Sequence, residues 1–259
     1  MSDRFDVVHE VRSFAPQEDL EVLYWVGCAA AADERVARVA RSMVRIMNRA
    51  GVRFAVLGSE ERCSGDPARR SGNEMLFDTL VRANLETFAK YRIERVVTHC
   101  PHCFHTFRND YPTFGAAPVV QHHSEFVRDL LASGRVTVSH AVRETLTFHD
   151  PCYLSRHNGI TEAPREVLYQ IGVTPREMRR SREESFCCGA GGAHAFFEEH
   201  EGGRINHNRA REAVATGAQV IGTACPFCLT MMEDGLRSVG AAGQTRVRDI
   251  AELVADALV

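Results

Sequence analysis

The stretch VVTHCPHC (Val96–Cys103) decides the fold, and IGTACPFC (Ile221–Cys228) repeats it 125 residues later. Each stretch joins a short apolar run, typical of a β-strand, to a C-P-x-C motif. Proline suits the first turn of a helix, so a helix is expected to begin at each motif. The chain therefore predicts the same strand, cysteine pair and helix twice.

All nine cysteines follow this repeat. Matching cysteines are 124 or 125 residues apart, and only one position differs: RCSGDPAR (Arg62–Arg69) has Ser64 where FCCGAGGA (Phe186–Ala193) has Cys188. Self-similarity at a fixed spacing indicates a duplicated unit. The first copy contains Cys28, Cys63, Cys100 and Cys103, and the second contains Cys152, Cys187, Cys188, Cys225 and Cys228.

Strands alternate with helices in both copies. This pattern predicts an α/β fold with largely parallel sheets, in which ligands gather at the carboxyl ends of the strands. We expect a lead-in over 1–20, a first cysteine-rich (CSG) domain over 21–140 and a second (CCG) domain over 141–259. Strands are expected at 22–26, 53–58, 95–99, 146–150 and 219–223, and helices at 32–50, 73–91, from 161 onward and at 204–216.

Composition excludes several classes of protein. The formal net charge of −3 argues against a nucleic-acid partner, which normally requires a basic face. No stretch approaches the roughly 18 apolar residues of a membrane span. The N-terminal residues MSDRFDVVHEVRSF include acidic side chains where a signal peptide would be basic. The expected location is the cytoplasm.

The cysteines are expected to hold a metal or to do redox chemistry. An odd number of thiols in a cytosolic chain is a poor disulfide framework. Thiolates are the ligands of iron–sulfur clusters and of structural zinc, and ligands on separate α/β loops favour a redox cofactor over a zinc knuckle. A zinc-binding scaffold, or a metal-free thiol–disulfide enzyme that uses Cys187 and Cys188, remains the alternative.

Taken together, these motifs resemble a known family. The doubled pattern C-x34-CCG-x36-C-P-x-C is similar to the CCG domain of heterodisulfide reductase B and D subunits and related iron–sulfur oxidoreductases. CSGDPARRSGNE, HDPCYLSRHN and CCGAGGA most resemble the C-terminal part of iron–sulfur reductases similar to electron-transfer-flavoprotein:quinone oxidoreductases. The resemblance covers residues 20–258 and implies two similar α/β domains related by a pseudo-twofold axis.

The resemblance also implies cofactors. In the reductase B subunits, each complete motif holds a noncubane [4Fe–4S] cluster through five cysteines. The first motif, with Ser64 at the fifth position, is expected to hold a [4Fe–4S] cluster or zinc through its four cysteines. The second is expected to hold a noncubane cluster, with Gly189 in the cofactor-binding loop, through Cys152, Cys187, Cys188, Cys225 and Cys228.

The implied function is that of a heterodisulfide-reductase-like iron–sulfur oxidoreductase. It would transfer electrons between a flavoprotein or ferredoxin-like partner and a disulfide or quinone-linked acceptor. The chain lacks the C-x2-C-x2-C-x3-C-P run of ferredoxins, so another subunit or a further part of a longer protein must supply or accept electrons. The expected partners are a ferredoxin-like iron–sulfur subunit, a flavoprotein and a membrane quinone-linked subunit, through which the chain would associate peripherally with a membrane.

Several polar residues near the cysteines are candidates for catalysis. Arg156 and His157 follow Cys152, and His194 follows the glycine loop, so they could donate protons or hydrogen bonds at the site. His149 receives less weight than these three as a functional residue.

Other histidines and charged runs have structural expectations. His102 is expected near the metal, His105 on a solvated helix face, and His123 in the cleft between the domains. The runs REMRRSREE (176–184) and RINHNRAR (204–211) are expected to be solvated faces.

Overall fold

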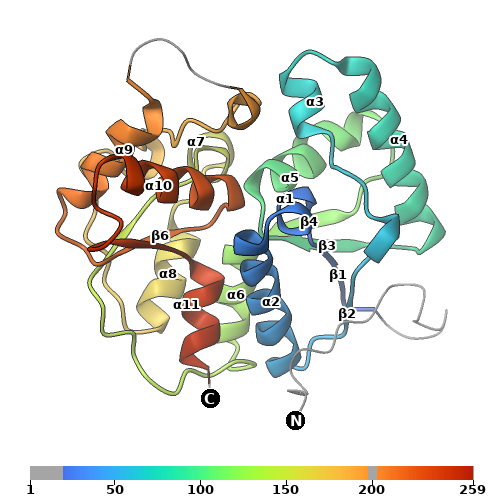
Figure 1. Cartoon of the computed structure of the whole chain (residues 1–259). Helices are drawn as coiled ribbons and strands as arrows, with labels where there is room; N and C mark the ends of the chain where they lie inside the picture. Colours follow the sequence, from blue (N-terminus) through green and yellow to red (C-terminus); the bar gives the residue numbers. More distant parts are fainter. Residues whose placement is uncertain (1–19, 198–202, 259) are drawn as a thin grey trace.

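A computed structural model describes residues 20–197 and 203–258 (Figure 1). We call residues 20–145 the first half and residues 146–258 the second half. The expected lead-in over 1–20 lies outside the described residues, except for its last position.

The first half contains a four-stranded parallel sheet. Its strands are β1 (Val22–Trp25), β2 (Phe54–Ala55), β3 (Arg95–Thr98) and β4 (Val119–His122), in the order β2-β1-β3-β4. The strands expected near 22–26 and 95–99 are confirmed. The strand expected over 53–58 was too long, because the chain turns into a 3-10 helix at Gly58–Glu60.

The second half contains a three-stranded parallel sheet. Its strands are β5 (Leu146–Phe148), β6 (Val220–Thr223) and β7 (Arg246–Asp249), in the order β5-β6-β7. β5 corresponds to β1 and β6 to β3. The sequence pattern did not predict β7 or its counterpart β4. The fold class, α/β with parallel sheets, is confirmed.

The helices follow the same duplicated order. Those of the first half are α1 (Cys28–Ala32), α2 (Glu34–Arg49), α3 (Asp66–Arg70), α4 (Glu74–Lys90), α5 (Pro101–His105) and α6 (His123–Ala132). Those of the second half are α7 (Cys152–Asn158), α8 (Glu162–Gln170), α9 (Ile205–Val214), α10 (Pro226–Ser238) and α11 (Ile250–Ala257).

Local sequence explains where these helices begin. The Asn73 side chain accepts from the backbone N–H of Leu76 and caps α4, as expected from the sequence. Asp249 and Glu252 form a capping box at α11. Pro101 and Pro226 occupy the first helical position of α5 and α10, where the missing N–H is no loss.

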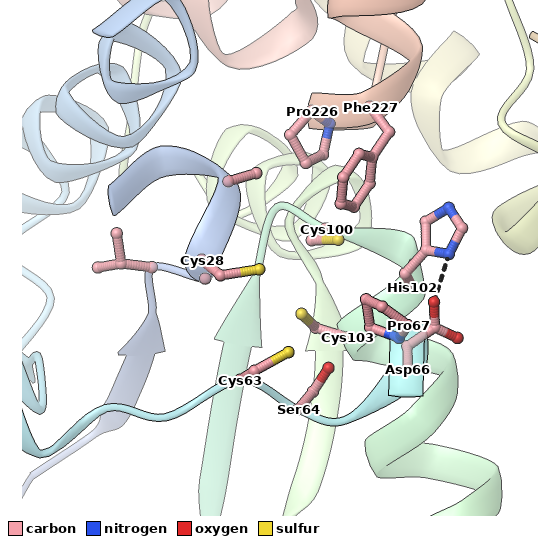
Figure 2. A pocket seen from close by; sticks show the side chains of 13 residues that line it. Cys28, Cys63, Ser64, Asp66, Pro67, Cys100, His102, Cys103, Pro226 and Phe227 are labelled. Carbon is pink, nitrogen blue, oxygen red and sulfur yellow. Dashed lines mark hydrogen bonds and ion pairs between the residues drawn. The ribbon is translucent and has the colours of Figure 1, made fainter. Parts of the chain in front are cut away.

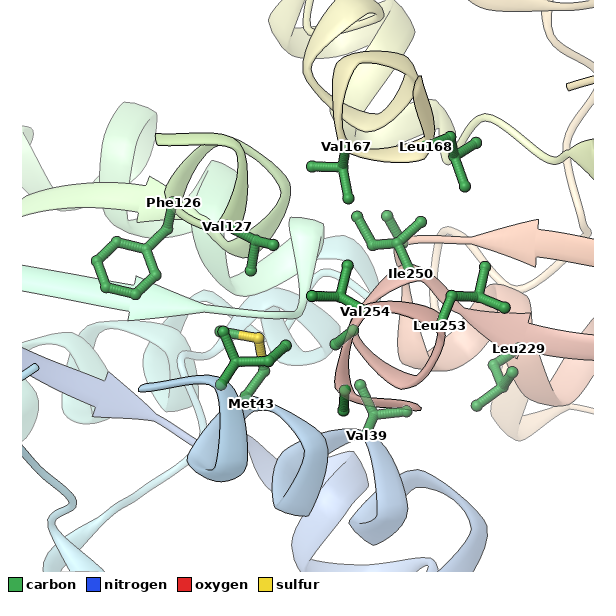
Figure 3. Close-up of a cluster of buried hydrophobic side chains, with 14 of the residues drawn as sticks. Val39, Met43, Phe126, Val127, Val167, Leu168, Leu229, Ile250, Leu253 and Val254 are labelled. Carbon is green, nitrogen blue, oxygen red and sulfur yellow. The ribbon is translucent and has the colours of Figure 1, made fainter. Parts of the chain in front are cut away.

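The two halves pack crosswise. α2 of the first half contacts α11 of the second, and α8, the counterpart of α2, contacts α6, the counterpart of α11, so the two contacts repeat each other. Figure 1 shows these helices between the two sheets. Val39 and Met43 of α2 share one buried core with Val254 of α11, Val127 of α6 and Val167 of α8 (Figure 3). This reciprocal contact is the pseudo-twofold arrangement expected from the family resemblance.

Candidate metal centres

The cysteines lie where parallel strands end. Cys28 follows β1 and opens α1, and Cys100 follows β3 directly before α5. Cys152 and Cys225 take the matching places after β5 and β6. The predicted position of the motifs at the carboxyl ends of the strands is therefore confirmed. The helix starts add backbone N–H groups that favour the thiolate form of the nearby sulfurs.

Four thiols gather in a pocket of the first half, which we call the first site. Figure 2 shows the sulfur atoms of Cys28, Cys63, Cys100 and Cys103 lying together. Hydrogen bonds from the Cys28 thiol and the Gly65 backbone lower the pKa of Cys63 to about 7, although burial opposes this. The same contact between Cys28 and Cys63 raises the pKa of Cys28.

A left-handed glycine shapes the loop of each motif. Gly65 and Gly189 both have φ 95°. The Gly65 N–H donates to Cys63 Sγ over 3.4 Å, and the Gly189 N–H donates to Cys187 Sγ over 3.2 Å. A Cβ atom at Gly65 would also lie 2.7 Å from Cδ2 of Phe77. Glycine is therefore required for the turn that directs a backbone N–H at the preceding sulfur.

Ser64 lies in the first site at the place that Cys188 takes in the second. Ser64 is buried, and its hydroxyl hydrogen-bonds Cys103. In the matching pair, Cys188 Sγ lies 3.4 Å from Cys228 Sγ. The serine thus keeps the geometry of the missing thiol but offers a harder oxygen atom.

Five thiols form one connected cluster in the second half, which we call the second site. Cys152 and Cys188 both hydrogen-bond Cys187, and these two contacts lower the pKa of Cys187 far below that of a free thiol. Cys228 in turn contacts both Cys188 and Cys225. The structure therefore brings together all five cysteines of the complete motif.

His149 is the residue that the sequence pattern undervalued. It is fully buried, and Arg209 Nε donates to its Nδ1 over 2.9 Å. The guanidinium can only donate, so the proton of the neutral imidazole resides on Nε2. Nε2 finds no hydrogen-bond partner among the described residues, and a ring nitrogen lies within 4.8 Å of the Cys188 and Cys228 sulfurs. Burial, reinforced by Arg209, holds the pKa of His149 well below its usual range.

The position of His149 was its one sequence signal. It lies three residues before Cys152, at a strand end, where the first half has Trp25 before Cys28. Trp25 Nε1 is also buried without a partner among the residues described. The expectation that RINHNRAR is a solvated face was wrong at Arg209, which is fully buried because it binds His149.

These side chains fit a cofactor bound through sulfur. All nine cysteines are free thiols, and the buried N–H group of His149 has no acceptor among the described residues, a place that ligated sulfur would fill. Sulfur donors suit iron–sulfur clusters and zinc. The first site offers four thiols, enough for either, whereas the five thiols of the second site exceed the four ligands of tetrahedral zinc.

In the first half, a carboxylate ties the two ligand-bearing loops together. Glu61 accepts hydrogen bonds from the backbone N–H groups of Val26 and Gly27 at 3.0 and 2.6 Å. Burial raises the pKa of Glu61 to about 7. The contact joins the exit of β1, which leads to Cys28, to the loop that carries Cys63.

The second half also joins its strand exit to its cysteine loop through a carboxylate, but here the carboxylate lies at the strand exit and the N–H group lies in the loop. Asp150, at the exit of β5, accepts from the backbone N–H of Arg182 at 2.8 Å, in the loop before Cys187. Arg165 neutralises this buried carboxylate through two contacts of 2.8 and 3.0 Å, and it also binds Glu177. Neither support was expected from the sequence.

The three expected catalytic residues lie on the surface. Arg156 and His157 are exposed on α7, which begins at Cys152, and the His157 ring centroid is 4.9 Å from that of Tyr153. His194 opens an exposed 3-10 turn after the glycine loop. Their catalytic roles stay predictions, as do the nine cysteine ligands and Gly189.

Two other histidines differ from their expected settings. His105 is half-buried, with its ring 5.1 Å from Tyr153, rather than on a solvated face. His123 is fully buried between the halves, where its Nε2 lies 2.9 Å from Asp249 Oδ1. It therefore holds the halves together instead of lining an open cleft.

Comparison with known proteins identifies related chains. The cysteine-rich domain family, CCG, matches residues 22–108 and again residues 146–233. The chain is 43% identical to "Probable iron-sulfur-binding oxidoreductase FadF" of Bacillus subtilis, over 93% of this chain and 34% of the relative. It is 40% identical to "EtfAB:quinone oxidoreductase" of Syntrophomonas wolfei, over 95% of this chain and 36% of the relative.

A third relative is archaeal. The chain is 34% identical to the D subunit of the dihydromethanophenazine:CoB--CoM heterodisulfide reductase of Methanosarcina barkeri, over 93% of this chain and 60% of the relative. The chain thus spans about a third of the length of the two bacterial relatives. Across residues 20–197 and 203–258, no helix combines the length and hydropathy needed to cross a bilayer.

Proposed function

The chain belongs to the cysteine-rich domain family, and from this premise we propose that it is the iron–sulfur module of an oxidoreductase. The observation that carries the proposal is the connected set of five thiols in the second site, faced by the His149 N–H. The names of relatives support it, since one is named "Probable iron-sulfur-binding oxidoreductase FadF" and another is named as a subunit of a heterodisulfide reductase.

Each cysteine-rich domain, 21–140 and 141–259, would hold one cofactor. The second site would bind a noncubane [4Fe–4S] cluster through its five cysteines. The first would bind a [4Fe–4S] cluster or zinc through its four. A bound iron–sulfur cluster supplies a place to accept and release single electrons.

The residues around the second site have distinct tasks. The Gly189 N–H donates to Cys187, and the His149 Nε2–H is free to donate to ligated sulfur; both lower the electron density on the cofactor. Arg209 holds the His149 ring in one tautomer. Asp150 and Arg165 fix the separation of the two loops on which the ligands lie.

The reaction requires partners on both sides. A flavoprotein or a ferredoxin-like iron–sulfur subunit would supply electrons. Reduction of a disulfide consumes two electrons and two protons and yields two thiols; reduction of a quinone consumes the same and yields a quinol. His157 and His194, exposed beside the second motif, would deliver protons from solvent, and the exposed Arg156 would donate a hydrogen bond at the site.

The location follows from these partners. We place the chain in the cytoplasm, with peripheral membrane association through a quinone-linked subunit. The relative named as an EtfAB:quinone oxidoreductase supports such an acceptor.

A zinc-binding docking module is the second candidate. It is favoured by one observation, the four thiols of the first site with serine at the fifth position, which match a tetrahedral zinc site. A metal-free enzyme that cycles Cys187 and Cys188 between thiol and disulfide is the third candidate.

Metal analysis separates these candidates. Protein purified without oxygen is expected to be brown and to contain about four irons and four sulfides per occupied iron–sulfur site. About two zincs without visible absorption would instead establish the docking module. Reversible two-electron titration of metal-free protein would establish the thiol–disulfide enzyme.

A further inference from the structure

His102 belongs to the first motif by sequence but to the second site by position. It lies between Cys100 and Cys103, yet Figure 2 shows its ring turned away from the four sulfurs of the first site. Instead, the His102 side chain interacts with Cys225, a fully buried cysteine of the second motif.

Aromatic rings of the second half hold His102 in this orientation. The imidazole stacks on Tyr153, with ring centroids 4.0 Å apart and planes 28° apart. Phe227 meets it edge-on at 5.2 Å. Tyr153 directly follows Cys152, and Phe227 lies between Cys225 and Cys228, so both rings are fixed by the second motif.

A carboxylate of the first half fixes the other side of the ring. His102 Nδ1 lies 2.9 Å from Asp66 Oδ2, and Arg70 Nε donates to Asp66 Oδ1 over 3.2 Å. Asp66 is two residues beyond Ser64, in the loop of the first motif. A carboxylate that accepts from one ring nitrogen and orients the other toward a metal ligand is a recurrent way to tune a metal site.

The second half has no histidine–carboxylate pair at the matching positions. The residue that matches His102 is Phe227, and the one that matches Asp66 is Ala190. Phe227 and Pro226 line the pocket of the first site with apolar surface (Figure 2). Each half thus reaches into the site of the other, but only the first half brings a hydrogen-bond donor.

We propose that His102, oriented by Asp66, donates a hydrogen bond to Cys225 across the boundary between the halves and raises the reduction potential of the second-site cofactor. The inference rests on the proposed function in that it requires an iron–sulfur cluster in the second site. A hydrogen bond to a ligating sulfur stabilises the more negative, reduced state, so its loss lowers the potential. His102 is a positioning residue in this role, because it acts through Cys225.

The test is a redox titration followed by electron paramagnetic resonance on anaerobically loaded protein. Cys103→Ser and Cys228→Ser, each lacking a ligand of one motif, assign the signals to the two sites. His102→Phe, which copies the second half, is expected to shift the one-electron reduction equilibrium of the second site at least tenfold toward the oxidised form, a fall of about 59 mV. His102→Gln, which keeps a donor, is expected to restore part of this shift.

His105→Phe is the matched control. His105 lies on the same helix and also contacts Tyr153, but it hydrogen-bonds Asn158 and Asn109 rather than a cysteine. Its substitution is expected to leave both potentials unchanged. Selective loss of the second-site signal in His102→Phe, with the first-site signal kept, would also support the proposal.

The outcomes against the proposal are separable. An unchanged second-site potential in both His102 variants, or a shift confined to the first site, would overturn the role of His102 and leave the proposed function intact. Wild-type protein without iron and sulfide would overturn both.

Discussion

The first and second sites share a backbone geometry but differ in side chains at matching positions of the two motifs. In both, a glycine at φ 95° directs its N–H at a cysteine sulfur, and a C-P-x-C motif opens a helix after a parallel strand. Ser64 replaces Cys188, and Trp25 replaces His149. The duplicated scaffold fixes where ligands stand, whereas single substitutions decide which chemistry each site can perform.

The supports differ as well. The first half links its ligand loops through Glu61, which accepts hydrogen bonds from two backbone N–H groups. The second half uses Asp150 with the buried Arg165, and Arg209 behind His149. Each buried cation of the second half is paired with a carboxylate, Arg165 with Asp150 and Arg209 with Glu212, which offsets the cost of burying its charge.

Exchanging the fifth ligand should have the largest effect on this comparison. Cys188→Ser gives the second site the donor set of the first, and we expect loss of its distinctive cluster type. Ser64→Cys is the reciprocal change, and the first site should acquire the spectrum of the second, because Ser64 already occupies the place of a thiol beside Cys103. Mössbauer and paramagnetic resonance spectra with iron counts measure both. Unchanged spectra in Cys188→Ser would contradict the five-cysteine assignment.

Breaking the buried ion pair should have the next largest effect. Arg165→Ala leaves Asp150 charged and buried, so we expect a loss of about 3–5 kcal/mol in the free energy of unfolding. Arg41, 124 residues earlier, pairs with Glu34 on an exposed face of α2. Arg41→Ala should change stability by no more than about 0.5 kcal/mol. Denaturant titration measures the free energy of unfolding of both variants. Equal losses would show that Arg165 contributes no more to stability than the exposed Arg41 does.

The smallest effect concerns pH. Glu212 accepts from Arg180 and Arg209, and although burial opposes the change, these contacts hold its pKa below 4.5. A lowered carboxyl pKa gives stability that is full above pH 4.5 and is lost as the pH falls through the folded-state pKa. Glu212→Gln should therefore cost about 1 kcal/mol at pH 7 and less at pH 3.

Unfolding curves at the two pH values provide the measurement for Glu212. The exposed Glu86 of α4 is the control, and Glu86→Gln should have little effect at either pH. A penalty for Glu212→Gln that grows toward pH 3 would show that the ion pairs with Arg180 and Arg209 do not stabilise the fold.

Most of the correct predictions came from the spacing of the cysteines along the sequence. The cysteine offsets indicated the duplication, and β1, β3 and β6 are apolar enough to be recognised. β4 and β7 were missed because they are partly exposed: Val119 is 71% exposed, and Arg246 and Arg248 interrupt β7. Edge strands of this kind lack the continuous apolar run of a central parallel strand.

The residues that the sequence pattern misjudged act across long separations. Arg209 resembles its charged neighbours in sequence, and only the fold shows that it is buried against His149, 60 residues earlier. His102 could be assigned to the second site only once the packing of one half on the other was known. A sequence pattern indicates the spacing of apolar residues in a segment, but it does not indicate which distant residues that segment contacts.

The crosswise packing of α2 on α11 and of α6 on α8 has a consequence for stability. The described residues form two sheets, but their largest hydrophobic core contains residues of both halves, so neither half buries its apolar helix face by itself. The two halves should therefore depend on each other for stability, as the subunits of an obligate dimer do, although a single chain connects them. Denaturation should then abolish both metal centres in a single cooperative step, with no stage at which one half survives alone.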